Sequence, residues 1–142
     1  MAPELRVADR RPAGTRRLAA VALVLPVVAV GLASRFLGTG LPADLAGGVL
    51  YAVLVYVLLT AWRPHATAVS NAAIALALCV LIELLQLTSI PADLARAFGP
   101  VRLVLGTGFA PLDLAAYAIG AALALGADVL QARIRARRAA SG

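Results

Sequence analysis

The sequence predicts an all-α integral membrane protein with four transmembrane helices and a short interfacial or re-entrant helix between the third and fourth. Apolar residues make up 62% of the chain and charged residues 14%, against roughly 45–50% and about 25% in soluble domains. The apolar residues gather in four runs, each near the ~20 residues that cross a hydrocarbon core about 30 Å thick. Helices are expected because lipid offers no partners to backbone polar groups, and a helix pairs them internally.

The expected spans lie between two basic tails and form one membrane domain, residues 18–131. Residues 1–17 are rich in Arg and contain Pro and Gly, so we expect a disordered tail. A cleaved signal peptide is the alternative for the first apolar run. Residues 132–142 form the second basic tail. The four spans are predicted at residues 18–37, 45–62, 67–87 and 111–130.

The placement of Arg predicts the orientation of the chain in the membrane. Ten of the 13 basic residues, all Arg, lie in the two tails and at Arg63, whereas the other loops hold Arg35, Arg96 and Arg102. Loops rich in Arg stay in the cytoplasm, and four spans return both termini to that side. The use of Arg without Lys, with much Ala, Leu, Val and Gly, suggests a bacterial, GC-rich genome. We therefore predict a multi-pass plasma-membrane protein with both termini cytoplasmic.

One short pattern, Pro-x-Asp-Leu-Ala, recurs at Pro42–Ala46, Pro91–Ala95 and Pro111–Ala115. Pro suits the first turn of a helix, and a nearby Asp faces the positive end of the helix dipole. The pattern therefore predicts three helix starts on the outer side. The middle one opens a helix over residues 91–98 that is too short to cross. We expect residues 88–110 to be interfacial or re-entrant, with Leu94 and Phe98 facing lipid.

The composition excludes several kinds of site and partner. With one Cys and one His, neither an internal disulfide nor a multi-ligand zinc site is expected, and no cofactor is predicted. The net charge of +6 comes from Arg beside apolar runs, so membrane lipids with anionic headgroups are the expected partners and nucleic acid is not. Asp128 lies where the C-terminal Arg cluster can pair it.

Two pairs of polar residues interrupt the spans near the outer side. Glu83 and Gln86 lie three residues apart in the third span, and Asp113 and Tyr117 four apart in the fourth, so each pair shares a helix face. A carboxylate inside a span costs on the order of 2.5–3.5 kcal/mol near the helix centre and normally has a partner. Hydrogen bonding across the bundle and a ligand or proton site are both open for Glu83, and a helix-start role is sufficient for Asp113. Ala116, Gly120 and Ala124 give the fourth span a small-residue face for close helix packing.

Two Arg residues lie on the same predicted side as these pairs. Arg35 and Arg102 either neutralise the carboxylates or extend to lipid headgroups. Tyr51 from the second span is a further possible member, although packing explains it as well. The candidate ligand-binding cluster therefore comprises Glu83, Gln86, Arg102, Asp113, Tyr117 and Arg35.

The same residues resemble a known family. The strings Glu83–Leu87, Arg102–Phe109 and Asp113–Gly120, with Gly31–Arg35, are similar to the bacterial membrane family called domain of unknown function 2809, over roughly residues 31–120. A remoter resemblance is to VanZ-like membrane proteins, and it implies a role at the cell envelope through glycopeptide resistance in some members. The family implies a small multi-span protein and no established activity. Where its pattern has Gly-Asp before the aromatic residue of the second span, this chain has Gly47-Gly48, so an acidic member is missing there.

These observations favour a non-enzymatic membrane protein that binds an envelope or lipid-linked ligand, or a partner protein, through the outer cluster. One alternative is an intramembrane enzyme that uses Glu83 or Asp113 as general acid or base. The other is a small transporter subunit, which would have to oligomerise because four short helices make a narrow pore. Only Thr60, Ser70, Asn71 and Asp128 are polar in the cytoplasmic half, which predicts no continuous polar path.

Overall fold

The computed structural model describes residues 12–106 and 108–141, and within these residues every regular element is a helix. Four helices are long and apolar enough to cross a membrane, namely α2 (Ala13–Leu37), α3 (Gly40–Trp62), α4 (Ala68–Leu85) and α7 (Pro111–Ala140). Two short helices, α5 (Ile90–Ala97) and α6 (Val101–Leu105), lie between α4 and α7. The predicted all-α membrane fold with four spans is confirmed.

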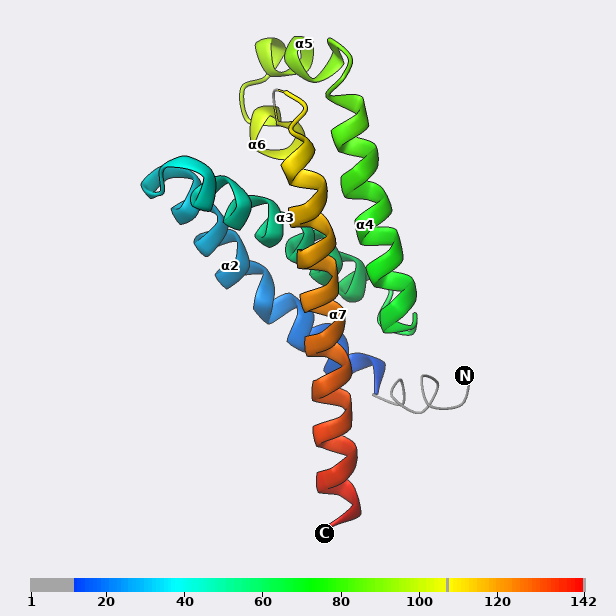
Figure 1. The fold of residues 1–142 in the computed structure, drawn as a ribbon. Helices are drawn as coiled ribbons and strands as arrows, with labels where there is room; N and C mark the ends of the chain where they lie inside the picture. The colour runs from blue at the N-terminus through cyan, green and yellow to red at the C-terminus, as the bar shows by residue number, and fades with distance from the viewer. Residues whose placement is uncertain (1–11, 107, 142) are drawn as a thin grey trace.

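Helix α3 is the centre of the bundle, because it packs against α2, α4 and α7. Helix α7 also packs against α4, whereas α2 packs mainly along α3. In Figure 1, α5 and α6 lie at one end of the bundle, and the start of α2 and the end of α7 point to the other. These ends are called the α5–α6 end and the terminal end below. Most of α2 is exposed, and its outward side chains are large and apolar, as lipid contact requires: Leu18, Val21, Leu25, Val30 and Phe36.

Small residues bring α3 and α7 into close contact. Ala116 and Gly120 are buried, as the small-residue pattern predicts. A Cβ on Gly120 would lie 2.9 Å from the Cβ of Ala52, and one on Gly48 would lie 2.8 Å from the Cβ of Ala116. Neither glycine has room for a side chain. The two backbones can approach each other because glycine has no Cβ.

The first and last of the four long helices, α2 and α7, extend beyond their predicted spans. Helix α2 begins at Ala13, so residues 13–17 are helical and the prediction of a disordered tail is wrong for them; residues 1–11 lie outside the described part. Helix α7 continues to Ala140, so residues 132–140 of the predicted second tail are helical too. Hydropathy marks the lipid-embedded stretch, while Ala and Arg, which are strong helix formers, continue the helices beyond it.

The three predicted helix starts are present with shifted boundaries. Pro91 is the second residue of α5 and Pro111 the first of α7, and the short predicted helix is α5. Helix α3 begins at Gly40 instead of residue 45, which places Asp44 beyond its first turn. Helix α4 ends at Leu85, so Gln86 is its C-cap instead of part of the span. Helix α6, which contains Arg102, was not predicted.

Candidate functional site

Glu83 is fully buried and joins α4 to the start of α7. Its Oε1 accepts a hydrogen bond from the backbone N–H of Ala110 at 2.5 Å, and its Oε2 accepts one from the Tyr117 hydroxyl at 3.2 Å. Ala110 is the N-cap of α7, where the helix dipole favours a negative charge. Hydrogen bonding across the bundle therefore explains Glu83. Among the described residues, no ion pair joins it to an Arg side chain.

Two side chains of the bundle hold α6 in place. The amide nitrogen of Gln86 donates to the carbonyl of Leu105 at 2.6 Å, and the Tyr51 hydroxyl donates to the carbonyl of Val104 at 2.9 Å. The last carbonyls of a helix lack partners inside it, so these bonds satisfy α6 while fixing its position. Gly106 ends α6 with a φ of +66°, a conformation that favours glycine. A Cβ there would also lie 2.6 Å from the Gln86 amide nitrogen.

A cavity of about 430 Å³ lies at the α5–α6 end, lined by residues of α2, α3, α4, α6 and α7. Four charged residues from four helices line it: Arg35, Asp44, Arg102 and Asp113. Arg35, Asp44 and Arg102 are exposed and Asp113 is half-buried, so the charged part is open to the surroundings.

Aromatic and aliphatic side chains complete the lining of the cavity. The rings of Tyr51 and Tyr117 line it with their centroids 6.1 Å apart. Val27, Val28 and Leu54 supply an apolar wall farther from the α5–α6 end. The cavity is therefore amphipathic, with charges at one end and hydrocarbon at the other.

The four charged side chains of the cavity form no ion pair among the described residues. Across residues 12–106 and 108–141, the ion pairs are Arg16–Asp128 and Arg96–Asp93, and neither involves the cavity. Asp44 and Asp113 line the same cavity, and two carboxylates in one cavity favour a cationic group there.

Five of the six predicted site residues line this cavity, and the sixth lies behind it. Arg35, Gln86, Arg102, Asp113 and Tyr117 come together from four helices. Glu83 is bonded to the back of the site through Tyr117 and does not line it.

Sequence reasoning missed Asp44, which it explained only as part of a helix start. The missing acidic residue at Gly48 was the available signal, because Asp44 lies one helical turn earlier and therefore on the same face. At Gly48 itself a Cβ would lie 2.8 Å from Ala116, so this packing of α3 on α7 excludes a carboxylate there. Asp44 supplies the acid to the cavity instead.

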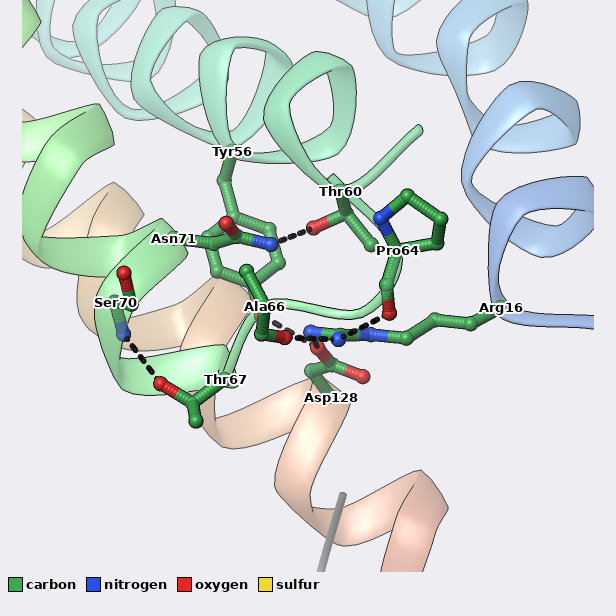
Figure 2. Close-up of polar contacts among 9 residues, drawn as sticks. All are labelled: Arg16, Tyr56, Thr60, Pro64, Ala66, Thr67, Ser70, Asn71 and Asp128. Carbon is green, nitrogen blue, oxygen red and sulfur yellow. Dashed lines mark hydrogen bonds and ion pairs between the residues drawn. The ribbon is translucent and has the colours of Figure 1, made fainter. Parts of the chain in front are cut away.

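A second polar cluster, formed around Arg16, Tyr56 and Asp128, lies at the terminal end (Figure 2). Arg16 Nη2 donates to Asp128 Oδ2 at 2.7 Å, and the Tyr56 hydroxyl donates to the same oxygen at 2.5 Å. Arg16 Nη1 donates to the carbonyls of Pro64 at 2.9 Å and Ala66 at 2.5 Å. Arg16 is only 3% exposed. The cluster ties α2, α3, α7 and the loop before α4 together. Among the described residues, Asp128 forms its ion pair with Arg16 and not, as had been expected, with the C-terminal Arg cluster.

Two further polar contacts lie at this end. Asn71 donates through Nδ2 to the Thr60 hydroxyl at 3.2 Å, which joins α4 to α3. Thr67 caps α4 by accepting the backbone N–H of Ser70 at 3.1 Å. In the part of the chain that the structure describes, no three His, Cys, Asp or Glu side chains are grouped to hold a metal ion.

Fold and site together define a small four-span membrane protein with an amphipathic cavity at one end. A family model described as "Protein of unknown function (DUF2809)" matches residues 38–121, which is more than half of the chain. The chain belongs to this family, as its sequence motifs predicted. No curated protein and no solved structure matches the chain.

Proposed function

We propose that this protein is a non-enzymatic plasma-membrane protein that binds an amphipathic, lipid-linked envelope ligand in the cavity at its α5–α6 end. The observation that supports this most strongly is the separation of charged and apolar residues along the cavity. Arg35 and Val27 are eight residues apart on α2, or roughly 12 Å, and Asp44 and Leu54 are roughly 15 Å apart on α3. A headgroup fits the part of the cavity beside Arg35 and Asp44, and a hydrocarbon chain fits the part beside Val27 and Leu54.

The position of the cavity suits a ligand that arrives through the bilayer. Its α2 wall belongs to a helix that packs mainly along α3 and is otherwise exposed to lipid. Its volume of about 430 Å³ falls within the roughly 300–1,000 Å³ of small-molecule sites. Of the two carboxylates that the enzymatic alternative names, Glu83 contacts Ala110 and Tyr117 and does not line the cavity, whereas Asp113 does. The presence of charges of both signs in the cavity favours binding as the proposal.

The proposal places both termini in the cytoplasm and the cavity in the outer half of the bilayer. The Arg-rich terminal end supports this orientation, and the remote resemblance to VanZ-like proteins, which stays a prediction, agrees with a role at the envelope. A test replaces Cys79, the single cysteine, with Ala and adds Gly99→Cys, in the exposed turn after α5, or Ser141→Cys. A membrane-impermeant maleimide should label the Gly99→Cys protein in intact cells and the Ser141→Cys protein only after lysis. The reverse pattern would contradict the orientation.

Two glycines allow a matched test of ligand binding. Gly47 lines the cavity, Gly126 lies on α7 outside it, and a Cβ added to either meets no atom within 4 Å. Gly47→Leu should fill the cavity without disturbing helix packing, and Gly126→Leu should leave it open. Native mass spectrometry of the detergent-purified proteins measures retained lipid. We expect wild type and Gly126→Leu to retain lipid and Gly47→Leu to lose it. Equal retention by all three would refute the proposal.

A further inference from the structure

We infer that the cavity selects a lipid whose headgroup carries both a phosphate and a primary ammonium, and this inference rests on the proposed function. The cavity presents two guanidinium groups, on Arg35 and Arg102, and two carboxylates, on Asp44 and Asp113. Its charged lining is therefore neutral in sum but contains both signs. A headgroup with one charge of each sign complements it, whereas a headgroup of one sign meets repulsion from half of the lining.

The guanidinium groups suit the phosphate. Arg35 lies in the last turn of α2 and Arg102 in α6, so the two approach the cavity from different elements. A guanidinium donates two parallel hydrogen bonds to phosphate oxygens. Helix α6 is fixed by Tyr51 and Gln86 through the carbonyls of Val104 and Leu105, so the backbone that bears Arg102 is already in position before a ligand binds.

The carboxylates suit the ammonium. Asp44 and Asp113 both line the cavity, so a cation there faces two carboxylates. A primary ammonium has three N–H donors and can therefore bond both carboxylates.

The test compares three lipids and one soluble headgroup on the purified, delipidated full-length protein. Phosphatidylethanolamine has phosphate and primary ammonium, phosphatidylcholine has a quaternary ammonium without N–H donors, and phosphatidylglycerol has phosphate alone. Phosphoethanolamine lacks the hydrocarbon chains. Native mass spectrometry with lipid competition measures relative affinity. We expect phosphatidylethanolamine to bind about tenfold more tightly than either other lipid, as the loss of one charge-assisted bond implies, and phosphoethanolamine to bind far more weakly.

Variants assign the selectivity to named residues. Asp44→Asn, beyond the first turn of α3, should lower the affinity for phosphatidylethanolamine and raise that for phosphatidylglycerol, because it removes one carboxylate from the lining. Arg102→Gln should weaken both. Asp93→Asn, on exposed α5 outside the cavity, is the matched control and should change neither.

The possible outcomes separate this inference from the proposed function. In one outcome, the wild type binds phosphatidylglycerol or phosphatidylcholine as tightly as phosphatidylethanolamine, and the binding is lost in Gly47→Leu. That result would overturn the headgroup assignment and leave lipid binding in place. Selectivity that survives Asp44→Asn and Asp113→Asn would overturn the assignment too. Binding of no lipid by the wild type would overturn both.

Discussion

Both ends of the bundle contain Arg and Asp, but these charges differ in whether other described residues pair with them. At the terminal end, Arg16 has an Asp128 carboxylate and two backbone carbonyls as acceptors and is almost completely buried. At the α5–α6 end, Arg102 and Asp113 line an open cavity, and no ion pair between described residues engages them. A buried charge needs partners, and the charges at the terminal end have them within the protein. The charges at the α5–α6 end stay available to a ligand.

Glu83 shows that position along the bundle does not decide the role of a charge. It lies at the α5–α6 end, yet both of its oxygens are bonded within the protein. Its role resembles that of Asp128 more than that of Asp113. What separates a structural charge from a candidate ligand contact is therefore whether the fold already satisfies it, and substitutions at the two kinds of position should differ in their effects.

The largest expected effect on stability comes from Arg16→Ala. Arg16 pairs with the Asp128 carboxylate, and removing one partner of a buried ion pair costs about 3–5 kcal/mol. Arg17 is the matched control, because it is the next residue along the same helix and is exposed. Thermal unfolding in detergent should show a large destabilisation for Arg16→Ala and almost none for Arg17→Ala. Equal melting temperatures would mean that the terminal cluster does not hold the bundle.

Glu83→Ala should have the next largest effect. The substitution leaves the Ala110 N–H and the Tyr117 hydroxyl without their acceptor, at about 1–3 kcal/mol for the buried hydroxyl and less for the half-buried N–H. Glu83→Gln keeps an acceptor oxygen and should lose less. Chemical unfolding followed by circular dichroism measures both. If both variants were as stable as the wild type, Glu83 would not be anchoring the start of α7.

Gly120→Ala tests the close packing of α3 on α7. The added Cβ would lie 2.9 Å from the Cβ of Ala52, and overpacking of this kind costs about 1–3 kcal/mol. Gly126→Ala is the control on the same helix, where a Cβ meets nothing within 4 Å. We expect the first to lower the melting temperature and the second to keep or raise it. If Gly120→Ala left the melting temperature unchanged, α3 and α7 would not approach each other so closely.

The smallest effect on stability is expected at the cavity. Arg35→Gln and Asp44→Asn remove exposed charges that no described ion pair uses, so delipidated protein should change by less than about 0.5 kcal/mol. The same thermal unfolding measurement applies. A loss comparable to that of Arg16→Ala would erase the difference between the two ends.

Local sequence patterns predicted the parts of this molecule that depend on local chemistry. The four spans follow from hydropathy, Ala116 and Gly120 from small-residue spacing, and Pro91 and Pro111 from helix-start chemistry. Gln86, Asp113 and Tyr117 were found because polar side chains are rare inside apolar runs, and Arg35 and Arg102 because they lie on the same predicted side.

Contacts between distant segments explain what was missed. Arg16 was placed in a disordered tail because its acceptors, Pro64, Ala66 and Asp128, lie at least 48 residues away in the sequence. Asp44 was explained as a helix start because nothing in its own segment indicates that Asp113 lies near it. Helix α6 has five residues and is held by side chains from α3 and α4, so its own sequence is too short to predict it.

The most direct test of the central claim measures stability and lipid retention together for Arg102→Gln and Arg16→Gln. We predict that Arg102→Gln loses bound lipid while the delipidated protein melts at the wild-type temperature, and that Arg16→Gln melts at a much lower temperature. If Arg102→Gln retained its lipid and was destabilised as strongly as Arg16→Gln, the charges of the cavity would be structural and the claim of a ligand site would be wrong.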